Sequence, residues 1–587
     1  MFFLGVIQDN AEKKYDSLFI KKNAEMYNPH DVDLIEMQNS FINIWYSNNK
    51  CCSKEKVLFF EYGNTKIVIL GNWNMQETTK KDLFHIYRKK SFDLIHKKSK
   101  GEYIIIFYCT ATKKFDIIKS PIARFNCYYK IVYDTLVISS TLDYFWNSDA
   151  QNVFADEKHI KKYLASRLLQ TDLLNSNCTP YNDVFKLING SWVKITNKTH
   201  KANVIWKPNN STLVEKSIEN TANELRRLLE KSLGEFLESL RKKSDIRIFL
   251  SGGYDSSTVA YLAEKIIKQH NYDFNVKYLH YLYEGKGNEL IYAQQIAQDT
   301  KRSLKCVKPD DDNAFLSGFF PLRRYAEPNE QVLYGHSKVS HEKDGDVFLN
   351  GCGGDHLLLA SQESVVGLLK KPNCEWSTMV KNLAQKTQQN PFGLVFKCLI
   401  KKIKNLSGDN NEWLYNLCSN EFIRKYLKRC RTIKYPRCFF DDFSQKNYER
   451  ICGGTIFPNV DGAGSVNYSP FYNQEVIELC LNIPAYYKYN GIENRIVHKM
   501  AMADLLPQVV LDRNNKSSNE DSIKNAVKNN YRELYDFFGN SELEDMGIIK
   551  HGKIQDILKQ LEMGCCTDIP SAVKVLSIEA WIRSLRG

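Results

Sequence analysis

Long hydrophobic runs are missing from this chain of 587 residues, although 43% of its residues are hydrophobic. No stretch of 18 or more apolar residues occurs, which excludes a membrane-spanning helix. The N-terminal stretch 1–8 is largely apolar, but it is too short and lacks the basic flank of a signal peptide. We therefore expect these residues to form a first β-strand of a cytoplasmic protein.

Paired cysteine motifs are also missing. The sixteen cysteines are scattered, with no C-x-x-C pair and no Cys/His spacing typical of a zinc site. The adjacent pairs at 51–52 and 565–566 cannot easily close ordinary disulfides within themselves. We interpret the cysteines as reduced thiols, in keeping with a cytoplasmic location.

The net charge of +13 comes from many small clusters, such as those at 88–100, 241–243 and 424–431. Such clusters are typical of solvated faces, but they could also steer an acidic substrate or hold a nucleic acid. The aromatic residues are spread through strand-like segments and do not form a basic stacking platform. We therefore expect no nucleic-acid partner.

The motif with the most chemical content is Ser-Gly-Gly-Tyr-Asp-Ser-Ser at 251–257, directly after the largely apolar run 246–250. This pattern predicts a strand, a glycine turn and a helix that opens at about Thr258. Glycines allow close backbone approach to a ligand, and amides and hydroxyls at a helix N-terminus bind anions. Asp255 within an anion site needs an offsetting cation, and Mg²⁺ on a polyphosphate is the usual one.

The alternative interpretation is an ordinary glycine turn capped by serines. The preceding strand and the two serines together favour an ATP site. No lysine follows the glycines, so this is not the common P-loop; the pattern resembles the pyrophosphatase loop of synthetases that split ATP into AMP and pyrophosphate. The residues that we assign to ATP binding are Leu250, Ser251, Gly252, Gly253, Asp255, Ser256, Ser257, Tyr278 and Gly351.

Two types of structure follow each other along the chain. The first 205 or so residues read as β-rich, with strands at 102–109, 115–120, 128–133 and 136–140 and an Asn-Gly hairpin at 187–193. A polar stretch at 207–212 is a plausible linker, and a helical pattern begins at Val214. After the 251–257 loop, strands at 276–283 and 304–307 alternate with a helix at 289–298. This alternation predicts an α/β domain with a parallel sheet and its ligand at the strand C-termini.

A second glycine turn follows the apolar strand end at 347–350. It reads Gly351-Cys352-Gly353-Gly354-Asp355-His356, and Asp355 could share Mg²⁺ with Asp255 on the phosphates of ATP. The alternative is a glycine-rich turn with a capping aspartate. His356 could orient the substrate or could be structural, and we interpret His280 as a core side chain.

Further along, Ser469-Pro470-Phe471 precedes a helix at 474–481, and a second helix is expected at 491–506 with Arg495 and Lys499 one turn apart. Lys516 then lies in a polar, loop-like segment. A lysine there could stabilise pyrophosphate or an anionic intermediate, or it could be an ordinary surface residue.

These motifs together resemble the asparagine synthetase superfamily over nearly the whole chain. The resemblance implies a glutamine amidotransferase-like domain of αββα (Ntn) type at 1–206 and an ATP-pyrophosphatase domain at 214–587. Amidotransferases of this family begin Met-Cys-Gly, but here Phe2 replaces the cysteine nucleophile, and Lys119-Ser120-Pro121 replaces an arginine-aspartate pair. Without a nucleophile the first domain cannot hydrolyse glutamine and is expected to be a scaffold.

Loss of the glutaminase points to branches that use an amine already present in the substrate. The 350–357 motif looks most like that of lasso-peptide (microcin-type) macrolactam cyclases, and Lys516 maps onto the family's active-site lysine. Glu289 to Ala293 resembles the family's E-x-x-x-A segment. A tyrosine–glutamate pair of β-lactam synthetases has no clear match, because Glu449 has the wrong spacing.

The resemblance implies catalytic roles for Lys516 and Asp355, metal binding by Asp255 and Asp355, and substrate contacts by Cys352, Gly353, Gly354 and His356. ATP with Mg²⁺ would adenylate an Asp or Glu side chain of a precursor core peptide, and the peptide's N-terminal amine would then close a macrolactam. A leader-binding protein and a leader peptidase would be partners. A β-lactam synthetase-like enzyme, an ammonia-dependent asparagine synthetase and an RNA-modifying protein remain as alternatives.

Overall fold

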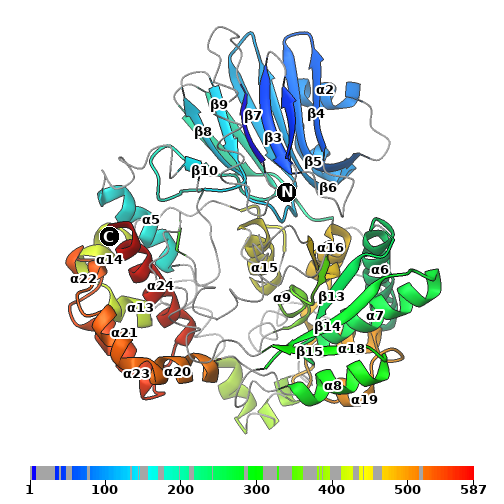
Figure 1. Ribbon diagram of the computed structural model, residues 1–587, viewed down its shortest axis with the longest axis vertical. Coiled ribbons are helices and arrows are strands. Elements are labelled where there is room, and N and C mark those ends of the chain that lie inside the picture. The colour runs from blue at the N-terminus through cyan, green and yellow to red at the C-terminus, as the bar shows by residue number, and fades with distance from the viewer. Residues whose placement is uncertain are drawn as a thin grey trace.

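The computed structural model describes residues 3–7, 34–38, 41–47, 56–75, 80–132, 135–142, 144–145, 157–169, 177–196, 199–209, 217–240, 242–282, 289–307, 327–328, 347–360, 380–382, 384–385, 388–396, 412–427, 435–439, 442–453, 466–513 and 520–586. These residues form a β-sandwich, a parallel sheet with its helices, and a helical cluster, which are separate lobes in Figure 1. None of the helices described is long and apolar enough to cross a membrane.

The N-terminal lobe consists of two six-stranded antiparallel sheets. The first has the order β10-β8-β9-β1-β3-β2 and the second the order β12-β11-β7-β6-β5-β4. The strands of the first sheet are β1 (Phe3–Ile7), β2 (Leu34–Gln38), β3 (Ile42–Ser47), β8 (Tyr128–Val132), β9 (Thr135–Ser139) and β10 (Phe185–Lys186). Those of the second are β4 (Lys56–Tyr62), β5 (Thr65–Met75), β6 (Ser99–Cys109), β7 (Lys114–Lys119), β11 (Ser191–Thr196) and β12 (Thr199–Val204).

Buried side chains from both sheets form the core of this sandwich, with Phe3 and Ile44 from the first sheet packing with Val68 and Ile104 from the second. The outer face of the second sheet is covered by α2 (Lys80–Lys89) and α3 (Asp93–Lys98). The strands expected between 102 and 140 are confirmed, since β6 pairs with β7 and β8 pairs with β9.

The hairpin expected at 187–193 is wrong. β10 pairs with β8 in the first sheet, whereas β11 pairs with β7 and β12 in the second. The Asn-Gly turn therefore carries the chain from one sheet to the other. The side chain of Asn189 donates to the carbonyl oxygens of Ala123 and Ile451, and these long-range contacts hold the turn in its crossing position.

The parallel sheet has the order β15-β14-β13-β16-β17, with every neighbouring pair parallel. Its strands are β13 (Asp245–Phe249), β14 (Asn275–Tyr281), β15 (Leu304–Val307), β16 (Val347–Leu349) and β17 (Val466–Tyr468). The helices and short turns around it are α6 (Ile218–Glu238), α7 (Tyr254–His270), α8 (Leu290–Asp299), α9 (Gly354–Leu358), α15 (Asp442–Gly453), η6 (Pro470–Tyr472), α16 (Gln474–Asn482), α17 (Ala485–Lys488), α18 (Ile496–Ala501) and α19 (Gln508–Leu511). The expected α/β fold class is confirmed.

The third lobe is a helical cluster with its own buried core. It contains α5 (Glu157–Leu169), α13 (Glu412–Leu417), α14 (Asn420–Lys425), α20 (Glu520–Asn529), α21 (Tyr531–Phe537), α22 (Glu542–Asp545), α23 (Lys553–Glu562) and α24 (Ile569–Arg586). In sequence α5 belongs to the first 206 residues, yet its Ile160 and Leu164 share a core with Val573 and Leu576 of α24. The division of the chain at 206–214 stays a prediction.

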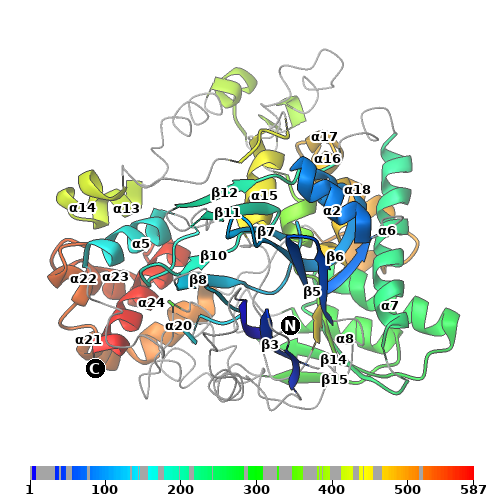
Figure 2. The same cartoon turned by 90° about the horizontal axis from the view of Figure 1, so that it is seen from above.

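Polar contacts join the sandwich to the parallel-sheet lobe, and Figure 2 shows the sandwich between the helices of the other two lobes when viewed from above. Arg124 donates to the carbonyl oxygen of Asn467 in β17 at 2.7 Å. Lys100 forms an ion pair with Glu475 of α16, also at 2.7 Å. The N-terminal lobe is therefore attached directly to the elements that follow the expected active-site motifs.

Candidate active site

The 250–253 loop connects the end of β13 to α7. The helix begins at Tyr254, four residues before the expected Thr258, so the expected start is wrong. The residue at its N-cap is Gly253, in extended conformation. Because the helix starts early, Asp255, Ser256 and Ser257 all lie in its first turn, where the positive end of the helix dipole favours anions.

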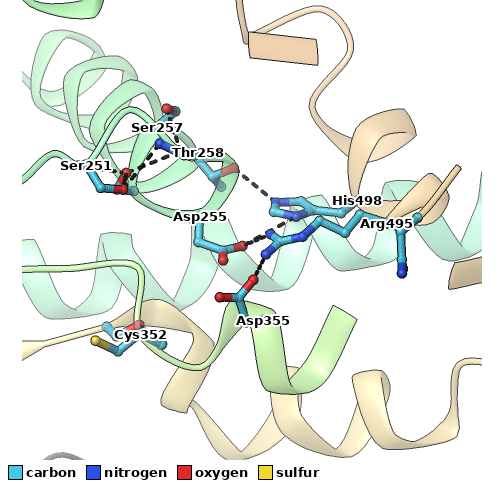
Figure 3. A network of polar contacts seen from close by, with 12 residues as sticks. Ser251, Asp255, Ser257, Thr258, Cys352, Asp355, Arg495 and His498 are labelled. Atoms are coloured by element: carbon cyan, nitrogen blue, oxygen red, sulfur yellow. Dashed lines mark hydrogen bonds and ion pairs between the residues drawn. The ribbon is translucent and has the colours of Figure 1, made fainter. Parts of the chain in front are cut away.

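Hydrogen bonds within the loop hold its hydroxyl groups in place. The Oγ atoms of Ser251 and Ser256 are 3.0 Å apart, and the backbone N–H of Gly253 donates to Ser251 Oγ at 3.2 Å. Ser257 Oγ donates to the carbonyl oxygen of Gly253 at 2.7 Å. The loop is thus ordered by its own serines, and Figure 3 shows this cluster at the start of α7.

The second glycine turn lies against the first loop because β16 is the parallel neighbour of β13. A Cβ atom at Gly351 would come within 2.5 Å of the Asp255 carbonyl carbon, and one at Gly354 would collide with the Asp255 carboxylate. Only glycine permits this approach at the two positions. The two motifs, about a hundred residues apart in sequence, therefore form one site at the C-terminal edge of the sheet.

One arginine joins the two aspartates of these loops. Arg495 Nη1 donates to Asp255 Oδ1 at 2.5 Å, and its other terminal nitrogen pairs with Asp355 Oδ1. Figure 3 shows the two carboxylates pointing toward this guanidinium. The sequence prediction brought Asp255 and Asp355 together correctly but gave Arg495 no role. Charge balance could have signalled it, since two partly buried carboxylates close together favour a nearby cation.

Arg495 also differs from the expectation for its segment. The helix predicted at 491–506 is shorter, since α18 spans only Ile496–Ala501. Arg495 is its N-cap residue and has a left-handed backbone, with φ of 62°. The expected helix is therefore wrong at its start, because the backbone takes a left-handed conformation at Arg495. The Arg495 side chain contacts the aspartates of both loops.

His498, one turn further on, is fully buried beside Asp255. Its Nδ1 lies 3.7 Å from Asp255 Oδ1 and its Nε2 lies 3.0 Å from Thr258 Oγ1. Burial lowers the pKa of His498 to about 3, and the positive charge of Arg495 acts in the same direction. The imidazole is therefore neutral at physiological pH and does not compensate the charge of Asp255.

The site fits a Mg²⁺ ion in its donor chemistry, since carboxylate oxygens are the protein ligands that this ion prefers. Over the described ranges, no group of three or more His, Cys, Asp or Glu side chains is placed to hold a metal. Two aspartates alone suit an ion that keeps phosphate oxygens and waters as its other ligands.

The other predicted residues lie at different distances from this centre. Cys352 is exposed on the second turn, its carbonyl oxygen accepting from Ser469 Oγ at 2.7 Å, and His356 follows in α9. Gly353, with φ of +95°, packs against Tyr472. These contacts connect the second turn to the 469–471 motif.

Two residues that we assigned to ATP binding, Leu250 and Tyr278, have side chains buried in the core. Tyr278 is fully buried in β14, and its hydroxyl donates to Glu264 of α7 at 3.4 Å. His280 Nδ1 contacts the carbonyl oxygen of Leu250 at 2.8 Å, as expected for a core histidine. The assignment of Tyr278 and Leu250 to ATP binding stays a prediction.

Lys516 and Phe2 lie outside the described residues, but the segment before Lys516 is fixed. Tyr254 donates its hydroxyl proton to the Leu511 carbonyl oxygen, and Arg513 pairs with Glu289. The Arg513 guanidinium also lies 4.6 Å from the centre of the Tyr292 ring. Glu289 is marked in the sequence by its resemblance to the family's E-x-x-x-A segment, and no local signal pairs it with Arg513.

Glu449 lies on α15 and accepts a hydrogen bond from Gln445 at 2.9 Å. Burial raises the pKa of the nearby Tyr435 hydroxyl, with Cys452 and Glu449 adding to the effect. The same helix contacts the second turn, because Asn447 donates to the carbonyl oxygen of His356 at 2.6 Å. These contacts do not test whether Glu449 acts as a base.

Comparison with known proteins identifies one domain. The family model described as asparagine synthase matches residues 224–392 and 464–583, which include both loops, Arg495 and Arg513. A search of curated proteins found no match to the sequence.

Three similar solved structures have low scores. The U34-tRNA thiolase NcsA from Methanococcus maripaludis is 20% identical with a TM-score of 0.20, over 31% of this chain and 62% of the thiolase, so this chain matches less than two thirds of that protein. The glutamine phosphoribosylpyrophosphate amidotransferase from B. subtilis is 9% identical with a TM-score of 0.21, over 52% of this chain and 81% of the other. An allosteric regulatory enzyme of purine biosynthesis is 10% identical with a TM-score of 0.21, over 63% of this chain and 72% of the other.

Proposed function

From the asparagine synthase domain in its C-terminal half, which supports an ATP-dependent amide ligase, we propose that this protein is a lasso-peptide cyclase. It adenylates an Asp or Glu side chain of a leaderless core peptide and joins it to the peptide's N-terminal amine, releasing AMP and pyrophosphate. The observation that carries the ligase chemistry is the meeting of Asp255 and Asp355 at the end of the parallel sheet. The motif at 350–357 supports the cyclase branch.

The residues of the two loops divide the work of the first step. The hydroxyls of Ser251, Ser256 and Ser257 and the amides of the α7 N-terminus bind the phosphates of ATP. Asp255 and Asp355 would hold Mg²⁺, which neutralises charge on those phosphates when it is bound. Lys516 would offset the charge on the departing pyrophosphate or the tetrahedral oxygen.

The second step depends mainly on positioning. The amine and the activated carboxyl must be held in attack geometry. Positioning of this kind can lower the activation free energy by roughly 7–11 kcal/mol at best. We assign the second turn to the peptide: Cys352 and His356 are exposed on it, and Gly353 and Gly354 are buried beside them. A leader-binding protein and a leader peptidase would deliver that peptide.

ATP–pyrophosphate exchange tests this proposal. The assay uses peptides with a free N-terminal amine and an internal Asp or Glu, and it compares wild type with Asp355→Ala. Asp299→Ala, at the C-terminal end of α8 in the same domain, is the control. Peptide-dependent exchange that Asp355→Ala abolishes and Asp299→Ala retains is the expected result. Exchange with free aspartate but not with peptides would make the protein a small-molecule ligase instead.

A further inference from the structure

The two aspartates of the site share one positive charge. Asp255 and Asp355 have side chains that are 13% and 30% exposed, and the Arg495 side chain between them is 10% exposed. Two carboxylates and one guanidinium leave a net charge of −1 in a partly buried place. Since like charges repel strongly there, the arginine between the two carboxylates offsets their repulsion.

Arg495 contacts both carboxylates with its two terminal nitrogens. His498 lies beside Asp255, with its Nδ1 3.7 Å from Asp255 Oδ1. Lys499 is directed elsewhere: its Nζ lies 3.5 Å from Glu493 and 5.6 Å from the centre of the Tyr254 ring. Arg495 is therefore the cation that is placed between the two carboxylates.

The backbone holds Arg495 in this position. Its left-handed conformation at the start of α18 is unusual for a residue other than glycine and is maintained by surrounding contacts. Asn494 Oδ1 accepts from the Arg495 backbone N–H at 3.0 Å, and the guanidinium lies 5.8 Å from the centre of the Tyr254 ring. A cation placed in this way is available before any ligand binds.

We propose that Arg495 is an internal counter-ion that excludes divalent metal from the aspartate pair until nucleotide arrives. With Mg²⁺ added, two carboxylates, the guanidinium and the metal sum to +1, so that metal and arginine repel each other at the same oxygens. The negative charge of the nucleotide phosphates reverses that charge balance. The phosphate oxygens also offer the guanidinium new hydrogen-bond acceptors. Metal and nucleotide are then taken up together.

This inference rests on the proposed function only for the use of ATP and Mg²⁺. It makes Arg495 a positioning residue for the aspartates, and it accounts for the close packing of two acidic loops.

The test is direct binding of Mn²⁺, as a spectroscopic substitute for Mg²⁺, to the full-length protein without nucleotide or peptide. Wild type, Arg495→Met and Arg495→Gln are titrated and free Mn²⁺ is measured by electron paramagnetic resonance. Both replacements are neutral and, like arginine, unbranched at Cβ, so the cost of the left-handed backbone is similar. We expect the Mn²⁺ dissociation constant of the two variants to be at least tenfold lower than that of wild type.

Two controls locate the effect. Adding Asp355→Asn to Arg495→Met should return Mn²⁺ binding to the wild-type level, because the aspartate pair is lost. Lys499→Met removes a neighbouring cation that does not contact the aspartates, and it should leave binding unchanged.

Folding of each variant is checked by thermal melting. A folded Arg495→Met or Arg495→Gln protein that binds Mn²⁺ no more tightly than wild type would overturn the proposal. Gain of binding in Lys499→Met equal to that in Arg495→Met would also overturn it, since the effect would then be one of net charge. Because no substrate is present, either result leaves the proposed ligase activity to its own exchange assay.

Discussion

Arg513 donates from its guanidinium to the carbonyl oxygen of Gly252 at 2.9 Å and pairs with the carboxylate of Glu289. Both side chains of the ion pair are 8% exposed. These contacts connect three elements: the loop after β13, the start of α8 and the segment that follows α19. The chain at Arg513, three positions before Lys516 in the sequence, is thus fixed to the loop that we assign to ATP phosphates.

Glu289→Gln should lower the turnover rate of pyrophosphate exchange roughly 10- to 100-fold, with a smaller change in the KM for ATP. The substitution leaves the buried guanidinium of Arg513 without its carboxylate, so the segment before Lys516 loses its fixed position, and small displacements of a reacting group have effects of this size. Exchange kinetics at varied ATP concentration separate the two parameters.

A matched control is available in the same domain. Glu264 of α7 makes a bidentate pair with Arg302 at 2.8 and 2.9 Å. Glu264→Gln should affect stability but not turnover. Equal losses of turnover in the two variants would contradict a specific role for the Arg513–Glu289 pair.

Gly354→Ala should abolish exchange, reducing it by about 100-fold or more, because the new Cβ would collide with the Asp255 carboxylate and push the second turn away from the first loop. Gly234→Ala is the comparison, since nothing lies within 4 Å of a Cβ at this position in α6. That variant should stay active and gain about 0.4–1 kcal/mol in stability. A fully active Gly354→Ala protein would show that the two loops need not touch.

Lys119→Met should stabilise the protein at pH 7, and the gain should shrink as the pH rises. Lys119 is 3% exposed, its ammonium lies 3.4 Å from the Leu187 carbonyl oxygen, and burial lowers its pKa from 10.5 to about 7. Between pH 7 and 10.5 the unfolded chain binds more protons than the folded protein, so the stability of wild type rises with pH in that window. The methionine side chain does not titrate, so position 119 adds no such pH dependence to the stability of the variant.

Thermal melting of both proteins at pH 6.5 and pH 9.5 measures this difference. The difference in melting temperature should be largest at pH 6.5, where a charged lysine is buried in wild type. Lys97→Met, at an exposed site on α3, should show no such trend. A difference for Lys119→Met that is the same at both pH values would mean that the lysine remains charged in the fold.

Local patterns predicted much of the parallel sheet and its loops. The strands β13, β14, β15 and β16 lie within a residue or two of the expected ranges. A strand can be predicted in this way because its signal is the pattern of apolar residues within the strand itself. The start of α7 was missed by four residues, since tyrosine and aspartate are weak helix signals but a glycine N-cap is sufficient here. The Asn-Gly turn was misassigned because its partners, Ala123 and Ile451, are distant in sequence.

The sequence by itself determined the two glycine turns, their aspartates and serines, and the order of strands and helices, since each depends on neighbours along the chain. Only the tertiary structure decided which charges meet. Arg495 pairs with Asp255 across 240 positions, and Arg513 contacts Gly252 across 261. Ion pairs depend on distance in space, and no spacing along the chain encodes which arginine the folded backbone brings to a carboxylate.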